Sequence, residues 1–568
     1  MTAQLIVRNT DIQSSSIDGT ISVYTAMAIA DGRILKVGTN EEMEGLADEN
    51  TKIIDAEGKT VLPGLGDAHL HASCTIELAS DYTLYDTANM KCSREEMIAH
   101  IQSVIKDYME HKDISTGIRI TGWAPTFFLE DPLGMPTAKD LDEVCSEVPV
   151  VLRSLCEHYL WVNTIAMEKA GITKDTPTPK HGIIFRDGEG NPTGIFQELP
   201  AVNLVKELLP EADYTVEEYR ESILTFQERY ASPKGITMIC DAVATPNAMT
   251  AYRQLAEEEK LNLRVSGVYV ADSGKEESQF DEFIARKGTE DIKDLYHIPT
   301  VKFFADGVEF GFYMCEPFEK NANISAGYPE DYRGFPEWSK EEMNRIFAKL
   351  DQAGFQIHVH AMGDAAVKMT LDAFEYARSQ NPGQDHRHTI AHVMDIKPED
   401  IERMGQLKVI ASMQPCWAIF DSYQEYGERL TGDRVFESYP MGKIIKAGGM
   451  VAAGTDFPVD GFLDPFIGMQ TAMTRRIPKS NPEYQEYGQR MLGDEESLMT
   501  WDETLAAYTI NGAYEMFYED ITGELAPGKS ADFLILNKKI SDVAAEDFET
   551  LHPLTVYFKG KEIYHTVE

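Results

Sequence analysis

The segment Val61-Leu-Pro-Gly-Leu-Gly-Asp-Ala-His69-Leu-His71 decides the fold of this chain. It is an apolar run that carries Pro and Gly and then ends in two histidines two residues apart. On a β-strand these two side chains point to the same face, because side chains alternate with a period of two. Two imidazoles at one strand end can hold a divalent metal ion. In a chain with 14 histidines the pair can also arise by chance, so the later strand ends decide its meaning.

Seven further short apolar runs follow this segment, so the chain has eight in all. The later runs are 236–241, 263–270, 299–305, 355–360, 387–392, 408–413 and 449–456. Four of them contain or end in residue types that can bind metals, namely Lys302, His358, His360, His388, His392 and Asp456. The candidates therefore fall on the first, fourth, fifth, sixth and eighth runs.

Helical segments separate the runs. Thr215-Val-Glu-Glu218 and Ser339-Lys-Glu-Glu342 are capping boxes, followed by apolar residues at helical spacing. Strand and helix alternating eight times predict an α/β fold, a (β/α)8 TIM-like barrel, whose chemistry gathers at the carboxyl ends of the strands. Histidines at several of these ends would converge on one point.

Both ends of the chain predict β-structure outside the barrel. Short runs separated by Gly, Asp and Asn turns lie at 3–9, 20–28, 33–37 and 51–62, and again at 532–536 and 555–564, the last as a hairpin around Gly560. Neither end has enough strands for a core, so a composite β-sandwich is the economical interpretation. Two unrelated β extensions are the alternative. We therefore assign residues 1–60 and 519–568 to the sandwich, 61–75 to the first barrel strand with its metal motif, 76–214 to an inserted subdomain and 215–518 to the rest of the barrel.

The inserted segment is far longer than a barrel loop requires. It contains a capped helix that opens at Ser93-Arg-Glu-Glu96 and apolar runs at 117–122 and 149–153. Because it follows the first barrel strand, we expect it to lie over the strand ends as a lid or substrate wall. The alternative is that the insertion lies at the periphery of the barrel and has no role at the active site.

Composition narrows the classes of partner. A net charge of −42 argues against nucleic acid and anionic membranes. No apolar run reaches transmembrane length, and the N-terminus lacks a signal-peptide core. The seven cysteines have no paired spacing, which suits a reducing cytoplasm. We expect a cytoplasmic protein with a small-molecule substrate, and a homodimer stays open.

Taken in order, these motifs resemble the amidohydrolase superfamily of metal-dependent hydrolases, and within it the branch that includes N-substituted formamide deformylases. The matching stretches are PGLGDAHLH (63–71), LDEVCSEVPVVLRSLCEHYLWVN (141–163), VKFFADG (301–307), HAMGDAAV (360–367), RHTIAH (387–392), ASMQP (411–415), GTDFPV (454–459) and TGELAPGKSADFLIL (522–536). The resemblance covers nearly the whole chain. It implies a barrel with one or two divalent metal ions, with zinc as the expected metal, beside a small β-sandwich built from both chain ends.

The resemblance also separates histidines that periodicity cannot. His69 and His71 would bind one ion. The family motif places a ligand directly before Ala-Met-Gly-Asp, which selects His360 over His358, and the resemblance likewise favours His392 over His388. His360 and His392 would bind a second ion, while His358 and His388 would be core residues or would support the ligands.

Lys302 and Asp456 can each be interpreted in two ways, as residues of the metal site or as residues with only a structural role. A lysine within an apolar strand is costly to bury as an ammonium, so a surface lysine is the structural interpretation. The resemblance implies that Lys302 is carboxylated and bridges two cations. Asp456 could cap a turn. The resemblance makes it a metal ligand and the general base for water activated by the metal.

The sequence indicates the residues that contact the substrate less clearly than it indicates the metal ligands. The candidates in or beside the motif segments are Trp123, Arg153, His158, Trp161 and Trp417. The chain departs from the family after Asp306-Gly307, where Val-Glu-Phe-Gly replaces a Ser-Leu-Gly-Ser type of turn, and at Ala391, where Glu is frequent. Both changes lie near the expected site, so an N-formyl substrate does not carry over directly.

The resulting hypothesis is a metal-dependent hydrolase of a C–N bond in a small amide-like substrate, such as an N-substituted formamide, an amide or a cyclic amide. An ester or lactone hydrolase, a hydratase or a decarboxylase on the same barrel is the alternative among enzymes. A catalytically silent scaffold is the alternative from another class, and the intact set of ligand residues argues against it.

Overall fold

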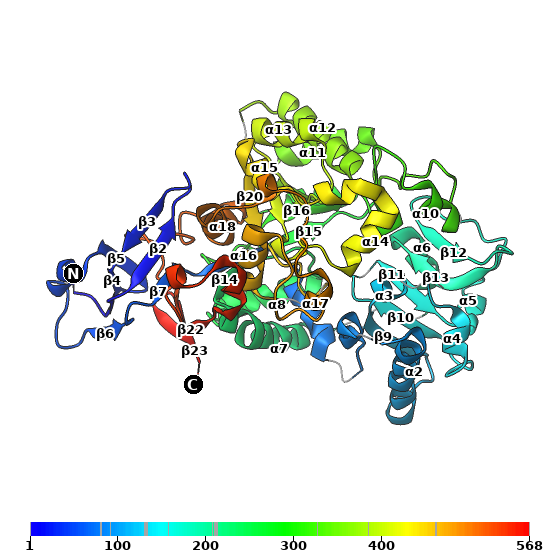
Figure 1. The fold of residues 1–568 in the computed structure, drawn as a ribbon, viewed down its shortest axis with the longest axis horizontal. Coiled ribbons are helices and arrows are strands. Elements are labelled where there is room, and N and C mark those ends of the chain that lie inside the picture. Colours follow the sequence, from blue (N-terminus) through cyan, green and yellow to red (C-terminus); the bar gives the residue numbers. More distant parts are fainter. Residues whose placement is uncertain are drawn as a thin grey trace.

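The computed structural model describes residues 2–79, 82–90, 92–129, 134–156, 158–206, 208, 214–326, 328–383, 385–459 and 463–566. Three parts follow one another along the long axis of the molecule (Figure 1). Strands from both chain ends form one end, a barrel with its helices forms the middle, and the segment after the first barrel strand forms the opposite end.

Eight parallel strands form the barrel, in chain order, as predicted. They are β8 (Leu65–Leu70), β14 (Ile236–Asp241), β15 (Arg264–Val270), β16 (Tyr296–Phe304), β17 (Gln356–Ala361), β18 (Thr389–His392), β19 (Ile410–Met413) and β20 (Met450–Ala453). The opening run divides at Gly64, because β7 (Thr60–Pro63) belongs to another sheet. Gly64 lies tightly against the neighbouring barrel strand β14, since an added Cβ would clash with the side chain of Thr237.

Helices connect the strands and cover the outside of the barrel. They are α7 (Val216–Phe226), α8 (Pro246–Glu257), α9 (Ser278–Arg286), α11 (Lys340–Gln352), α12 (Asp364–Gln380), α13 (Pro398–Leu407), α14 (Ser422–Thr431), α15 (Met441–Lys446), α16 (Pro465–Thr474), α18 (Trp501–Tyr508) and α19 (Ile510–Glu515). The predicted capping boxes at Thr215 and Ser339 are present, each with the reciprocal bond from the glutamate three residues on. Among the described residues, no helix is both long and apolar enough to cross a lipid bilayer.

The barrel is joined between its first and last strands by residues that follow β20. Asp456 N donates to His69 O over 2.8 Å, and His71 N donates to Phe457 O over 2.7 Å. We call this junction between the first and last barrel strands the seam. Asp67 strengthens the seam, since it accepts hydrogen bonds from both the backbone N and Oγ1 of Thr455. The seam therefore ties the two histidines of the opening segment to Asp456, although the chain separates them by most of the barrel.

The two chain ends form a β-sandwich, as predicted. One sheet has the order β5-β4-β1-β6 and the other β23-β22-β21-β7-β2-β3. The strands are β1 (Leu5–Arg8), β2 (Asp11–Ser15), β3 (Ile21–Tyr24), β4 (Ala26–Ala30), β5 (Arg33–Gly38), β6 (Lys52–Asp55), β7, β21 (Phe533–Leu536), β22 (Pro553–Phe558) and β23 (Lys561–His565). Side chains of both sheets share one apolar cluster, which includes Val7, Met27, Phe533 and Tyr557.

Details of the sandwich differ from the prediction. The run 20–28 and the run 51–62 each divide into two strands that lie in different sheets, a division that the apolar pattern did not predict. A chain that crosses from one sheet to the other must bend, and an apolar pattern does not mark the bend. The strand β2 was not predicted, because its sequence Asp-Ile-Gln-Ser-Ser is mostly polar.

The inserted segment has a five-stranded sheet of order β12-β13-β11-β10-β9. Its strands are β9 (Ile118–Trp123), β10 (Val150–Ser154), β11 (Tyr159–Val162), β12 (Ile183–Arg186) and β13 (Pro192–Gln197). Helix α2 (Arg94–His111), which opens at the predicted capping box, packs Met97, Ile101 and Ile105 into an apolar cluster with this sheet. Helices α5 (Thr164–Lys169) and α6 (Leu199–Lys206) contribute to a second cluster with the same sheet.

The insertion contacts the barrel at the loop that follows β16. Gln197 Nε2 donates to Val308 O over 2.8 Å, and Val308 N donates to Glu198 Oε1 over 3.0 Å. Tyr159 adds a hydrogen bond to Glu309 over 2.8 Å. Because this loop leaves the carboxyl end of a barrel strand, the insertion lies against the edge of the barrel where active sites form.

Gly454 tests the seam between the first and last strands. An added Cβ would lie 2.6 Å from His69 N and 2.8 Å from His69 O, both rigid backbone atoms. We expect Gly454→Ala to lower the free energy of unfolding by about 1–3 kcal/mol, a typical cost of overpacking. Gly45→Ala is the matched control, since nothing lies within 4 Å of its added Cβ. The measurement is the urea midpoint of both variants, and equal midpoints would show that the seam tolerates expansion.

Candidate active site

Two histidines of the first barrel strand and an aspartate after the last one form the centre of the site. His71 Nε2 lies 2.8 Å and His69 Nε2 3.4 Å from Asp456 Oδ1. One ligand atom from each residue lies within 4.8 Å of the others. Asp456 adopts a positive φ of 61°, a conformation uncommon for a residue other than glycine and held here by the seam. Burial raises the pKa of Asp456, but His71, His392 and Lys302 outweigh it, and the net pKa lies below the usual value.

Behind His69 lies a buried chain of polar side chains. His69 Nδ1 is 2.8 Å from His358 Nε2, and His358 Nδ1 is 3.5 Å from Glu515 Oε1. Burial first, and then the charge of Lys302, holds the pKa of both histidines well below the usual value. The imidazoles are therefore neutral, which is the form that binds metal ions. The contact with His358 fixes the orientation of the His69 ring.

Lys302 is fully buried on β16, which excludes a surface position for this lysine. Its Nζ lies 3.3 Å from His69 Nε2. Among the described residues, no carboxylate forms an ion pair with it within 4.0 Å. Burial lowers the pKa of the amine to about 8. An ammonium here is costly, and the same position suits a group that carries negative charge toward a cation.

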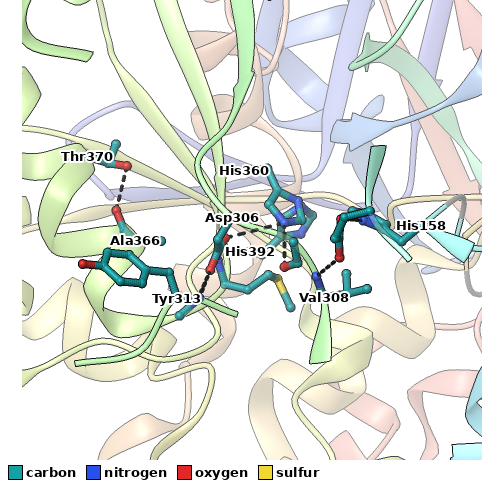
Figure 2. A network of polar contacts seen from close by, with 12 residues as sticks. His158, Asp306, Val308, Tyr313, His360, Ala366, Thr370 and His392 are labelled. Atoms are coloured by element: carbon teal, nitrogen blue, oxygen red, sulfur yellow. Dashed lines mark hydrogen bonds and ion pairs between the residues drawn. The ribbon is translucent and has the colours of Figure 1, made fainter. Parts of the chain in front are cut away.

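His360 and His392 lie together at the ends of β17 and β18, with ring centroids 4.6 Å apart (Figure 2). The His392 ring is also 4.9 Å from the His69 ring, and its Nδ1 lies 2.8 Å from Gln414 Oε1. Burial holds the pKa of both residues well below the usual value. Asp306, beside His360 in Figure 2, accepts three backbone N–H bonds and so fixes the loop after β16 against the loop after β17.

The structure thus brings together all six predicted ligand residues, His69, His71, Lys302, His360, His392 and Asp456. It separates His388 from them. His388 precedes β18, where its Nε2 lies 3.0 Å from Asp351 Oδ1 and its ring stacks on Phe374. His358 therefore supports a candidate ligand, whereas His388 belongs to the packing between the strand and α11.

A cavity of about 350 Å³ adjoins this group. Residues next to the candidate ligands line one side of it, among them Met362, Trp417 and Val459. The insertion lines another side with Leu155 and Cys156. Its size is that of a small-molecule site, and its walls come from both the barrel and the insertion.

A model of the Amidohydrolase family matches residues 52–564, which is most of the chain. The chain belongs to the amidohydrolase family. It is 27% identical to Protein LONG AFTER FAR-RED 3 of Arabidopsis thaliana, over 99% of this chain and 92% of that protein. It is 25% identical to the N-substituted formamide deformylase of Arthrobacter pascens, over 98% of this chain and 97% of that enzyme.

Solved structures agree on the fold. An uncharacterised metal-dependent hydrolase from Pyrococcus horikoshii superposes with a TM-score of 0.68 at 22% identity, over 95% of this chain and 99% of that one. Membership makes this amidohydrolase a hydrolase and implies a divalent metal ion. The neutral imidazole of His69, the ionised carboxylate of Asp456 and the adjacent His71 fit such an ion, because nitrogen and carboxylate ligands suit zinc-like metals.

The candidate substrate contacts divide into two groups. Trp417 lines the cavity and stacks on His392 at 5.5 Å, and the His158 ring lies 5.9 Å from the His360 ring. Trp123 and Trp161 instead lie fully buried in the core of the insertion, and each indole N–H donates to a backbone carbonyl within it. Neither is among the described residues that line the cavity, so packing within the insertion explains their positions and they are not substrate contacts.

Arg153, the fifth candidate substrate contact, is also placed by the structure. It lies on β10, with Nη1 3.5 Å from Glu77 Oε1. Arg153 does not line the cavity among the described residues.

The sequence analysis did not identify four residues of this amidohydrolase that position the candidate site residues or their loops: Glu198, Asp306, Gln414 and Glu515. Asp306 and Gln414 directly follow barrel strands inside quoted motifs, so their positions carried a usable signal. Glu515 lies at the end of α19, remote from every motif residue. Burial raises its pKa to about 8. Nothing in its local sequence predicts the contact with His358.

The different surroundings of His358 and His388 allow a test of whether His358 orients the candidate ligand His69. We expect His358→Leu to weaken zinc binding by about 10–100-fold, because residues that orient a ligand typically matter by this amount. His388→Leu is the matched control and should leave zinc affinity unchanged while it weakens packing against Asp351. Zinc affinity of metal-depleted protein, measured by competition with a chromophoric chelator, checks both. Equal losses in the two variants would contradict an orienting role for His358.

Proposed function

We propose that this amidohydrolase cleaves a C–N bond of a small amide-like substrate, such as an N-substituted formamide, an amide or a cyclic amide. The observation that carries the proposal is the convergence of His69, His71 and Asp456 with Lys302, His360 and His392, beside a cavity of small-molecule size. The relative named as a formamide deformylase, which aligns over nearly its full length, supports the reaction class. The altered loop at Val308-Glu309 keeps the substrate itself open among these amides.

The ligand residues suit one or two zinc ions. His69, His71 and Asp456 would hold one, and His360 and His392 would hold the other. When bound, a divalent cation polarises a carbonyl oxygen and lowers the pKa of water. Lys302, carboxylated on its amine, would be the ligand shared by the two positions. The buried ammonium first loses one proton; the neutral amine then adds to CO2, so that an N–C bond forms as a C=O π bond opens, and a second proton leaves the nitrogen. A buried cation would thereby become an anionic ligand.

Asp456 is the proposed general base. Its net pKa lies below the usual value despite burial, so the carboxylate is ionised at neutral pH. It takes a proton from the attacking water and then returns it to the departing nitrogen, which balances the hydrolysis. The contact with His71 at 2.8 Å and the seam hold the carboxylate in one place.

His158 and Trp417 are the proposed substrate contacts. His158 Nδ1 is held by Glu198 Oε2 at 2.7 Å, so the ring is fixed from behind (Figure 2). The His158 side chain keeps 18% of its surface exposed. We assign it to orienting the substrate carbonyl next to His360. Trp417, stacked on His392, forms an apolar wall.

Two further points concern the cellular compartment of the protein and the other reactions that the same site could catalyse. None of the seven cysteines, all of which lie among the described residues, forms a disulfide, which supports the cytoplasm as the compartment. An ester or lactone hydrolase, a hydratase or a decarboxylase could use the same ligands. Metal content by elemental analysis, followed by a panel of formamides, amides, cyclic imides and lactones, separates them. One to two equivalents of zinc and turnover of amides support the proposal, and a metal-free protein with full activity would remove it.

Asp456→Asn tests the general base. We expect kcat to fall by about 10²–10⁴-fold, the usual contribution of a positioned base, while most metal stays with the histidines. The matched control is Asp395→Asn, a buried carboxylate that instead accepts a hydrogen bond from Ser438. Its kcat should stay near normal. An Asp456→Asn enzyme with near-normal kcat would remove the assignment.

Lys302→Ala tests the bridge. Because removal of the carbamate leaves His360 and His392 too few ligands, the second metal equivalent should be lost. Short carboxylic acids should restore part of it by occupying the vacated position. Metal stoichiometry and intact mass of both wild type and variant provide the measurement. An unchanged stoichiometry in Lys302→Ala would show that lysine does not bridge.

A further inference from the structure

The loop after β16 holds a carboxylate in an unusual setting. Glu309 has a positive φ of 46° and only 4% of its surface exposed. Its Oε2 accepts a hydrogen bond from Tyr159 of the insertion at 2.8 Å, and its Oε1 accepts one from Tyr423 of α14 at 3.1 Å. No basic side chain forms an ion pair with Glu309 within 4.0 Å among the described residues. A strained backbone and a buried carboxylate without a cation are costly unless they serve a function.

The same residue lines the cavity beside the candidate metal centre. Three carboxylates occur among the residues described as lining it, Glu309, Asp421 and Glu483, and the lining contains no Lys, Arg or His. Asp421 caps α14 by accepting from Gln424 N, and Glu483 accepts two hydrogen bonds from Ser422. Two of the three therefore hold backbone in place. Glu309 differs, because both of its partners are side-chain hydroxyl groups.

The remaining walls suit an organic cation. Trp417, Tyr423 and Tyr439 line the cavity, and aromatic faces attract ammonium and amidinium groups. Apolar side chains such as Met362 and Ile467 provide room for a hydrocarbon body. The charged side chains among the described lining residues are all acidic, which disfavours an anionic group at this wall, in a chain whose net charge is −42.

We propose that Glu309 selects substrates that carry a protonated nitrogen, an ammonium or amidinium group, on an apolar body. The cation would lie against the Glu309 carboxylate, which the two tyrosine hydroxyls hold in position, while the amide reaches the metal centre. This inference rests on the proposed hydrolase function and names its substrate class. Burial raises the pKa of Glu309 to about 7 in the absence of a cation, so a bound cation would favour the ionised form.

The test uses binding, which does not require turnover. Benzylamine and benzyl alcohol have the same apolar body, but only the amine is protonated at about pH 8, where Glu309 is ionised. Isothermal titration calorimetry of the full-length metal-loaded protein measures both. We expect benzylamine to bind at least about 10-fold more tightly, because a hydrogen bond to a charged partner contributes this much or more.

Two variants locate the effect. Glu309→Gln removes the charge and keeps the shape, so the preference for the amine should disappear. Asp421→Asn removes a charge from the same cavity but preserves the helix cap, so the preference should survive. A preference that is absent in wild type, survives Glu309→Gln or vanishes in Asp421→Asn would overturn the inference. The absence of a preference in wild type would overturn the inference even where Glu309→Gln does not fold, and in that case Glu309→Ala, which removes the carboxylate altogether, provides the second test of dependence on Glu309.

The test of the cation site and the test of the proposed hydrolase function can fail independently of each other. Hydrolysis of neutral amides without a Glu309-dependent preference for benzylamine would overturn the inference and leave the hydrolase proposal intact. A Glu309-dependent preference in a protein that hydrolyses no amide would support the cation site and overturn the proposed reaction. If Glu309 only connects the insertion to α14, Glu309→Gln would lower the melting temperature without a change in selectivity, which also overturns the inference.

Discussion

The seam between the first and last barrel strands is the constraint on which the site depends. Hydrogen bonds from Asp456 N to His69 O and from His71 N to Phe457 O join segments that are remote in sequence. They require glycine at 454 and a positive φ at Asp456. A chain that met these conditions only for stability would have no reason to bury two imidazoles and a carboxylate there. The seam therefore serves stability and chemistry together.

Electrostatics explains why the centre suits a cation. Burial keeps His69, His360 and His392 neutral and lowers the pKa of Lys302 to about 8, so the Lys302 amine gives up its proton more readily than an exposed lysine. Asp456 stays ionised. The resulting centre has lone pairs and a negative charge among largely buried side chains, where a divalent ion is the natural counterpart. The insertion adds a wall and, through Tyr159, positions Glu309 at the cavity.

The sequence predicted the barrel well because each strand carries a short apolar run, and because parallel strands must end at one edge. It brought the six candidate ligand residues to the carboxyl ends of the strands for the same reason, with the family resemblance needed to separate His360 from His358 and His392 from His388. It could not predict Glu515 behind His358, since that contact depends on how a helix packs. Nor could it show that Trp123 and Trp161 fill the core of the insertion, because a buried indole and a ligand-binding one look the same in a sequence.

The central claim is that the convergence around the seam is a metal centre. Anomalous X-ray diffraction from crystals of the zinc-loaded protein, recorded on both sides of the zinc absorption edge, tests it most directly. The account predicts a strong zinc peak at about 2.0–2.2 Å from His69 Nε2, His71 Nε2 and an oxygen of Asp456. No peak there, with these side chains placed as described and zinc bound elsewhere or absent, would contradict it.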